Sequence, residues 1–322
     1  MNINDHNSVR VTFILLAFNQ EAFIEEACLS ALSQTYENIE FIFSDDKSSD
    51  RTFELMQSTV NESRAADRPV QVRQNPENIG LIEHINLLCE IATGELIVVA
   101  AGDDISIPSR TEQLVDAYLK SDRKANSIHS SVIMVDETGK ELGLLEPRII
   151  KNKMDLIDIS LSTQLLIGAT HAWTKNMFEK FGPIKEKGSY EDLVIAFRSA
   201  LLGPISYVNA PLVYYRVGSG MSAYKKLPKN FAGAVNTRLK TAHIVAAVYG
   251  QRLRDARKIG RTDVAQLETA LIQTKIKTAI YSGQYADAIK LLNWQPAVLA
   301  SFIKTMGIIF FTKIRFLITN ET

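Results

Sequence analysis

The sequence is poor in cysteine: it has two in 322 residues, and both fall on apolar helical patterns. We therefore expect Cys28 and Cys89 to be reduced core residues, which excludes a disulfide-rich scaffold and a cysteine metal site. The segment from Met1 to Val9 is polar and lacks the apolar core of a secretory signal, so we expect the body of the chain to face the cytoplasm. No run of about 20 uncharged apolar residues occurs, so no membrane-spanning helix is predicted.

A net charge of either sign is also absent, since 36 Lys+Arg balance 36 Asp+Glu. The balance conceals an asymmetry. Residues 1–222 hold 20 Lys+Arg and 31 Asp+Glu, a net of −11, whereas residues 223–322 hold 16 and 5, a net of +11. The acidic part, residues 1–222, suits a metal-dependent site. The basic tail, residues 223–322, suits an anionic surface such as phospholipid headgroups or nucleic acid. Alternatively, the tail docks on the acidic part. The tail lacks a platform of interleaved aromatic and basic residues, so no nucleic-acid partner is expected.

The chain does have 46% hydrophobic residues, which fits one large α/β domain with an appendage. Apolar runs first alternate with helical patterns, as is typical of βαβ units. The predicted strand and helix pairs are 9–17 with 21–34, 39–44 with 51–63, 70–73 with 81–92, and 96–101 with 108–120. Further along we predict shorter, mixed strands around the same sheet, together with one helix. The strands are 128–135, 170–174, 205–208 and 212–217, and the helix is 190–202.

The most informative segment is the adjacent pair Asp103 and Asp104, which follows the apolar strand 96–101 and precedes Pro108. Ligands collect outside the carboxyl ends of parallel strands, so the pair is expected where a metal ion and its ligand bind. The alternative is an Asp cap on a helix that has Pro in its first turn.

Seven segments, in order, are similar to motifs of the family 2 inverting glycosyltransferases, which have the GT-A fold. The segments are 11–19, 30–36, 44–50, 75–80, 102–104, 190–192 and 211–216. The resemblance covers roughly residues 9–222. It implies a GT-A (nucleotide-diphospho-sugar transferase) domain over 1–222 with a mixed, mainly parallel sheet, followed by a basic α-helical region over 223–322.

The resemblance also implies an activity: inverting transfer of a hexosyl or N-acetylhexosaminyl group from a nucleotide-diphosphate donor, expected to be a UDP-sugar. The expected acceptor is a saccharide or lipid-linked saccharide in bacterial surface-polysaccharide assembly, such as O-antigen or capsule. Mn²⁺ or Mg²⁺ would neutralise the diphosphate. Ala101 and Gly218 stand where the family often has an Asp and a His. These departures leave room for an alternative, an inactive nucleotide-sugar-binding module that recruits partners through its helical tail.

The resemblance assigns roles to individual positions. The donor-binding set is Ala17, Phe18, Asn19, Glu21, Asp45, Asp46, Arg73, Asn78, Gly80, Asp103 and Arg216. The metal ligands are Asp104 and Asp103, the general base is Asp192, and the acceptor-pocket residues are His171, Trp173 and Glu191. Ordinary structural roles remain as alternatives: an Asx turn for the pair 45–46, an edge charge at 73, a core position at 173, and first-turn helix acids at 191–192.

The tail shows helical patterns at 235–257, 264–282 and 285–292, of which the last two form a helical hairpin. The final segment, 302–318, is apolar with three interspersed cations, Lys304, Lys313 and Arg315. This pattern is similar to an interfacial anchor, so we expect peripheral contact with the inner face of the plasma membrane. The alternative is a buried terminal helix or a homodimer interface.

Overall fold

The computed structural model describes residues 8–63, 68–149, 154–218, 228–292 and 295–319. The chain forms two compact units. The first comprises residues 1–159, 164–187 and 191–224, and the second comprises residues 160–163, 188–190 and 225–322.

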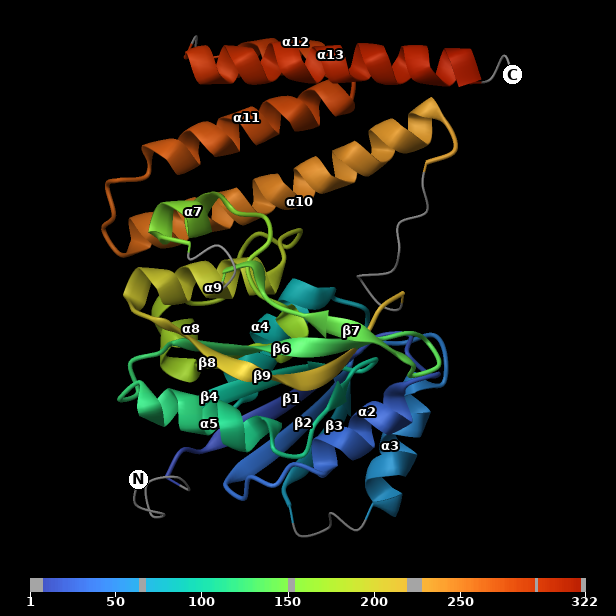
Figure 1. Ribbon diagram of the computed structural model, residues 1–322, viewed down its shortest axis with the longest axis vertical. Coiled ribbons are helices and arrows are strands. Elements are labelled where there is room, and N and C mark those ends of the chain that lie inside the picture. Colours follow the sequence, from blue (N-terminus) through green and yellow to red (C-terminus); the bar gives the residue numbers. More distant parts are fainter. Residues whose placement is uncertain (1–7, 64–67, 150–153, 219–227, 293–294, 320–322) are drawn as a thin grey trace. The chain divides into compact units, whose positions relative to one another are not determined.

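A mixed sheet forms the centre of the first unit (Figure 1). Its first half is parallel, in the order β3, β2, β1, β4. The bounds are β1 Val11–Ala17, β2 Ile39–Asp45, β3 Val70–Gln74 and β4 Leu96–Ala101. All four lie within two residues of the predicted strands, because β1, β2 and β4 are mainly apolar runs and β3 alternates apolar with polar residues.

The second half of the sheet continues the order as β8, β6, β9, β5, with β7 paired to β6. β6 and β9 are parallel, whereas β8, β5 and β7 are antiparallel to their partners. The bounds are β5 Ile105–Ser106, β6 Ser127–Val135, β7 Glu141–Leu145, β8 Ala172–Thr174 and β9 Ile205–Arg216. The prediction of two strands at 205–208 and 212–217 is wrong. One strand crosses both, and its register against β6 shifts near Ser131, which faces Pro211.

Helices cover both faces of this sheet (Figure 1). The helices of the first unit are α2 Ile24–Leu32, α3 Thr52–Glu62, α4 Leu81–Ile91, α5 Arg110–Lys120, α8 Lys175–Phe181 and α9 Glu191–Leu202, with α7 Leu156–Leu161 shared between the units. α2, α3 and α5 share one hydrophobic cluster with β1 and β2. Cys28 lies in this cluster, and both it and Cys89 are buried and unpaired, as predicted.

The second unit is helical: its elements are α10 Phe231–Lys258, α11 Ala265–Tyr281, α12 Tyr285–Lys290 and α13 Pro296–Thr319. α11 and α12 form the predicted hairpin, with Gly283 in the turn at φ 75°. α13 is one helix that is long and apolar enough, over Pro296–Leu317, to cross a membrane by length and composition. The prediction of no membrane-spanning helix rested on the absence of an uncharged run, whereas α13 passes this test of length and mean hydropathy with its three cations included.

Candidate active site

Three loops meet where β1, β2 and β4 end. The parallel register pairs Ala17 with Asp45 and Leu16 with Ala101. Two backbone hydrogen bonds also join the residues just beyond the strand ends. The N–H of Asp46 donates to the carbonyl of Ala17 at 2.9 Å, and the N–H of Gly102 donates to the carbonyl of Leu16 at 2.8 Å. The predicted donor and metal segments therefore lie together at the carboxyl edge of the sheet.

Gly102 allows the loop after β4 to approach the loop after β1 closely. A Cβ at this position would lie 2.5 Å from Oε1 of Gln20 and 3.2 Å from Cβ of Ala17. Any larger residue would therefore displace the loop that follows β1 and the acidic pair that follows β4.

The acidic pair is buried, with Asp103 7% and Asp104 5% exposed. Oδ1 of Asp104 accepts a hydrogen bond of 2.8 Å from the backbone N–H of Arg216, the last residue of β9. Burial, and then the charge of Asp103, raise the pKa of Asp104 well above its usual range. A buried carboxylate pair of this kind gains from a bound cation.

The pair fits one mode of metal binding. Mg²⁺ and similar ions in phosphate-transfer sites are commonly held by one or two carboxylates, with substrate phosphates and water completing the shell. Within the described ranges, no group of three or more His, Cys, Asp or Glu side chains gathers. Asp103 and Asp104 therefore fit a shared site completed by a diphosphate, and they do not fit a closed cage made by protein alone.

Arg216 has a different place from the predicted one. Its guanidinium is buried, lies 4.4 Å from the ring centre of Phe23, and forms a 2.9 Å ion pair with Glu26. Its Nε donates to the carbonyl of Asp103 at 3.1 Å, and another guanidinium nitrogen donates to the carbonyl of Asp136 at 3.0 Å. Its predicted place in the donor-binding set is therefore replaced by a structural role: this side chain holds the acidic loop to the end of β9.

Asp46 orders the loop that follows β3. Its Oδ1 accepts from the side chain of Asn75 at 2.7 Å and from the N–H of Ile79 at 3.0 Å, and its Oδ2 accepts from the N–H of Gly80 at 2.8 Å. Gly80 has φ 79°, a left-handed conformation that favours glycine. The Asn78 side chain also accepts from the N–H of Gly80, at 3.1 Å. Asp46 therefore orders this loop, and its place in the donor-binding set remains a prediction.

Asp45 is fully buried and turns its carboxylate back on its own loop. Its Oδ2 accepts from the N–H of Ser48 at 2.9 Å and from the side chain of Gln74 at 2.8 Å. The bond to Ser48 comes from the N–H three residues on, so it is a local side-chain-to-backbone bond but not the Asx turn, which closes two residues on.

Arg73 points inward and is not a solvated edge charge. It donates to Oγ of Ser44 at 2.7 Å and to Oδ1 of Asn75 at 2.8 Å, and burial lowers its pKa. Ser44 Oγ also lies 2.6 Å from Nε2 of His84, a residue that the sequence analysis missed. Burial lowers the pKa of His84 to about 4, so its ring is neutral at pH 7, and its Nε2 and Oγ of Ser44 form a hydrogen bond.

The loop after β1 is held by the loop after β2. Asn19, at φ 52°, accepts from the N–H of Ser49 at 2.9 Å and donates its own N–H to Oγ of Ser48 at 2.8 Å. Glu21 accepts from the N–H of Arg51 at 3.0 Å. These contacts leave the ring of Phe18 46% exposed beside Ala17, where an aromatic face suits stacking on a base.

The second acidic pair begins α9. Oδ1 of Asp192 accepts from the N–H of Leu193 at 2.7 Å. A Cβ on Gly168 would lie 2.9 Å from Oε1 of Glu191 and 3.5 Å from Cβ of Asp192, so an added methyl group would force the Glu191 carboxylate to shift. Burial, and then the charge of Asp192, raise the pKa of Glu191 to about 8. The pair therefore retains a proton at neutral pH.

The sheet register brings this pair to the carboxyl edge. β8 runs antiparallel to β4, with Val98 opposite Ala172, and the N–H of Val99 donates to the carbonyl of His171 at 3.1 Å. Gly168 precedes His171 by three residues, so it lies further toward the carboxyl end of β4. Glu191 and Asp192 pack on Gly168, and the two acidic pairs consequently share this edge of the sheet.

Two predicted acceptor residues, Trp173 on β8 and His171 just before it, are in the core. Trp173 is fully buried and His171 is 1% exposed, with its ring beside Oγ of Ser127. Neither side chain presents a face to a sugar, so the prediction of an acceptor contact is corrected to the core alternative. The sequence could not distinguish these roles, because aromatic residues are common in both buried strands and sugar sites.

Arg110 is a second residue that the sequence analysis missed. Its guanidinium is fully buried and donates to Oγ of Ser106 at 2.9 Å and to the carbonyl of Val99 at 2.6 Å. Burial lowers its pKa to about 9, against the opposing charge of Asp104. It therefore supplies a fixed positive charge in the neighbourhood of the acidic pair.

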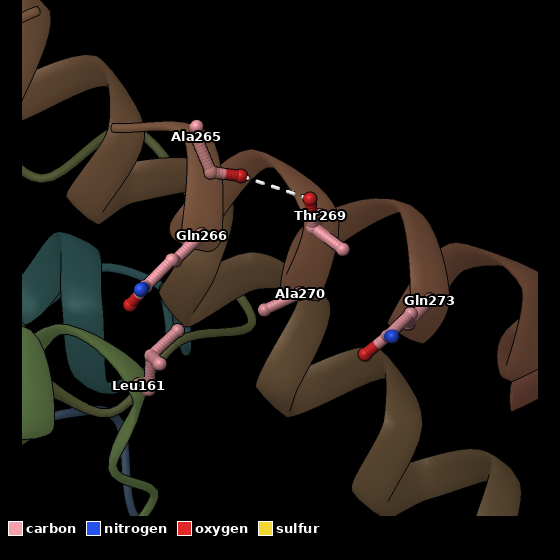
Figure 2. Close-up of a pocket in the computed structure, with 6 residues that line it drawn as sticks. All are labelled: Leu161, Ala265, Gln266, Thr269, Ala270 and Gln273. Atoms are coloured by element: carbon pink, nitrogen blue, oxygen red, sulfur yellow. Dashed lines mark hydrogen bonds between the residues drawn. The ribbon is translucent and has the colours of Figure 1, made fainter. Parts of the chain in front are cut away.

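Pockets also occur away from these residues. One lies in the second unit and has a volume of about 320 Å³ (Figure 2). Its lining residues are Leu161, Ala265, Gln266, Thr269, Ala270 and Gln273. It contains no titratable side chain, and we assign it no chemistry.

The mixed α/β fold and its acidic carboxyl edge define a class, that of enzymes with a GT-A domain. Residues 12–181 match the family described as Glycosyl transferase family 2. This match spans more than half of the chain, and the chain belongs to this family.

Comparisons with individual proteins agree with the family. An uncharacterized glycosyltransferase of Haemophilus influenzae is 23% identical over 328 residues, which cover 94% of this chain and 99% of the relative. Among solved structures, S. aureus TarS in complex with UDP-GlcNAc is 15% identical, with a TM-score of 0.54 over 92% of this chain and 89% of that chain. The mannosyltransferase PcManGT from Pyrobaculum calidifontis, in complex with GDP-Man and Mn²⁺, is 17% identical, with a TM-score of 0.54 over 96% and 88%. The structural likenesses confirm the predicted GT-A fold.

Proposed function

We propose that residues 1–222 form a metal-dependent, inverting transferase domain that moves a hexosyl or N-acetylhexosaminyl group from a UDP-sugar to a saccharide or lipid-linked saccharide. We further propose that the product enters bacterial surface polysaccharide such as O-antigen or capsule. Residues 223–322 would form a basic helical region that brings the domain to the inner face of the membrane.

One observation carries the proposal: two acidic pairs share the carboxyl edge of the sheet. Asp103 and Asp104 form the buried pair after β4, and Glu191 and Asp192 form the pair at the start of α9. The first pair suits the cation that accompanies a diphosphate, and the second suits removal of a proton from an acceptor hydroxyl. The two tasks together are those of glycosyl transfer.

In the proposed mechanism, Asp103 and Asp104 hold Mn²⁺ or Mg²⁺, which when bound would neutralise the leaving diphosphate. Phe18 stacks on the base, and the loop ordered by Asp46 closes the nucleoside side. The Asp192 carboxylate takes the proton of the acceptor hydroxyl. The hydroxyl oxygen then bonds to the anomeric carbon as the bond from that carbon to the diphosphate breaks on the opposite face.

Glu191 supports this step as the proton-holding member of the second pair. Burial and then the charge of Asp192 raise the pKa of Glu191 to about 8, which favours the protonated form of this side chain at neutral pH. A protonated neighbour can orient the Asp192 carboxylate without adding a second charge. This arrangement favours turnover over the alternative of an inactive binding module.

The choice of donor rests on likeness to proteins of the same fold. TarS is described in complex with UDP-GlcNAc, and PcManGT in complex with GDP-Man and Mn²⁺. Both donors are nucleotide-diphosphate sugars, which supports that class for this chain, and the TarS complex supports UDP within it.

The test is a transfer assay with a panel of UDP- and GDP-sugars and with soluble and lipid-linked saccharides as acceptors. We expect release of a nucleoside diphosphate that needs both the acceptor and Mn²⁺, and a product with inverted anomeric configuration by NMR. The Asp192→Asn variant should lose this release, and Asp122→Asn, a change of an exposed acid, should keep it. Binding of a donor without release in every pairing would favour the inactive binding module instead.

A further inference from the structure

The last helix, α13, has two apolar faces. One face packs within the second unit, where Val298 belongs to the hydrophobic cluster of α11 and α12, and Phe302 and Ile309 pack against it. Thr305 is also buried on this face. The spacing of four, three and four residues is that of one side of an α-helix.

The opposite face of α13 is exposed. Ile303, Phe310, Phe311 and Leu317 are each between 60% and 69% exposed. Helical rotation places these side chains, together with Ile314, on the side away from the packed face. The rings of Phe310 and Phe311 lie 5.7 Å apart and form the largest part of this stripe. A contiguous exposed apolar stripe is typical of a surface that binds a protein or a membrane.

Cations border the exposed stripe on both sides. Helical rotation places Lys304 and Arg315 along one border and Lys313 along the other. The sequence of α13 contains no Asp or Glu. Lys277 of α11 lies near this border, because burial and then the charge of the neighbouring Lys304 lower its pKa.

We propose that α13 lies in the plane of an anionic phospholipid surface, with Phe310 and Phe311 at the acyl boundary and its cations on the headgroups. Apolar side chains bordered by Lys and Arg are the arrangement expected of an interfacial helix. The packed face argues against a spanning orientation, because Val298 and Ile309 would have to leave α11 and α12 to meet lipid. The charges argue against a second copy of this chain as the occupant, because pairing two such helices would bring like charges together.

This inference deepens the proposed function in one respect: a catalytic domain tethered at a membrane surface suits an acceptor whose lipid carrier is embedded there. That step rests on the proposed function. The binding of α13 to lipid does not, and it is measured without any donor or acceptor.

The experiment is flotation of the full chain with vesicles of phosphatidylcholine, alone or mixed with phosphatidylglycerol. We expect binding to the anionic vesicles that weakens as salt rises. Replacing Lys304, Lys313 and Arg315 together by Gln should lower the partition coefficient by on the order of 100-fold. The matched control changes three exposed lysines of the first unit, Lys120, Lys124 and Lys140, to Gln and should leave binding unchanged.

A second pair of variants tests the apolar stripe. Phe310→Ser with Phe311→Ser should abolish flotation, whereas Leu142→Ser with Leu144→Ser, which changes two exposed apolar residues of β7, should not. Circular dichroism of each variant shows that the helices remain. Equal binding to neutral and anionic vesicles, or no binding by the wild type, would overturn the proposal.

Two further readouts exclude the other orientations. Bound protein should be released from vesicles by an alkaline carbonate wash, and resistance to this wash would indicate a spanning helix and overturn the proposal. Light scattering should give one oligomeric state for the wild type and the Phe310/Phe311 variant, and a loss of oligomer in the variant would assign the stripe to a second copy. Nucleotide binding, measured on the same preparations, reports separately on the proposed function.

Discussion

The backbone N–H of Arg216 donates a 2.8 Å hydrogen bond to Oδ1 of Asp104. This bond joins the end of β9 to the loop after β4, two segments that are 112 positions apart in the chain. The guanidinium of the same arginine donates a hydrogen bond to the carbonyl of Asp103. One residue therefore contacts both members of the acidic pair. The first bond orients the Asp104 carboxylate, and the second holds the backbone of Asp103.

Removal of the Asp104 carboxylate should weaken metal-dependent binding of nucleotide. We expect Asp104→Ala to raise the Kd for UDP in the presence of Mn²⁺ by roughly 10- to 100-fold, the loss of one charge-assisted contact. Titration calorimetry with and without a chelator measures this. An unchanged Kd in Mn²⁺ would place the metal elsewhere.

Replacement of the proposed base should separate binding from transfer. Asp192→Asn keeps the size of the side chain but cannot take a proton, so transfer should fall by on the order of 100- to 10,000-fold while donor binding persists. Initial rates and calorimetry on the same variant give both quantities. Transfer at the wild-type rate would remove Asp192 from the mechanism.

Stability should depend on pH through Glu191. Its folded pKa is about 8, above its ordinary value of 4.5, so the folded chain holds a proton that the unfolded chain releases. This contribution is fully present below about pH 4.5 and is lost as pH rises toward about 8.

Glu191→Gln removes that dependence. Relative to the wild type, the variant should gain stability as pH is raised from 5 to 8, as measured by the midpoint of denaturant unfolding. The control is Glu62→Gln, a change of an exposed acid of α3, for which no such trend is expected. A constant difference between variant and wild type across this range would contradict the assignment.

The space at Gly168 should matter for catalysis more than for folding. An added Cβ would lie 2.9 Å from Oε1 of Glu191, the end of a flexible side chain that can move away. We expect Gly168→Ala to lower the transfer rate and leave donor binding and the unfolding midpoint close to wild type. Gly188→Ala, where a Cβ has an ordinary contact of 3.9 Å, is the matched control. Equal rates for the two variants would show that the position of Glu191 is unimportant.

The carboxylate of Asp46 should contribute to stability as well as to nucleotide binding. It accepts hydrogen bonds from Asn75, Ile79 and Gly80, and Asp46→Asn would turn an NH₂ group toward these donors. The expected loss is about 1–3 kcal/mol in the free energy of unfolding. Urea denaturation measures it, and a loss close to zero would show that the loop after β3 is held by other contacts.

The sequence was sufficient for the strands β1 to β4, because β1, β2 and β4 are mainly apolar runs between polar segments and β3 alternates apolar with polar residues. It was also sufficient for the order of the acidic segments along the edge, since parallel strands bring their carboxyl ends together. It failed at β9, where Pro211 interrupts an apolar pattern that the register shift against β6 accommodates.

The direction in which individual side chains point could not be predicted from the sequence. An aromatic ring and a guanidinium both suit a site for a nucleotide-sugar. However, Trp173 is buried in the core, and Arg216 donates to the backbone carbonyl of Asp103. Arg110 and His84 were missed for the complementary reason, since their burial depends on neighbours that are distant in the chain. Such positions are decided by tertiary packing, which local patterns do not encode.

The most direct measurement is isothermal titration of the purified chain with UDP, GDP and their sugars, with Mn²⁺ and with a chelator. The account predicts that a uridine nucleotide binds in Mn²⁺, and that this binding is lost with the chelator and greatly weakened in the Asp104→Ala variant. Two results would contradict this prediction: no binding across the panel, or binding that is unchanged by the chelator and in the Asp104→Ala variant.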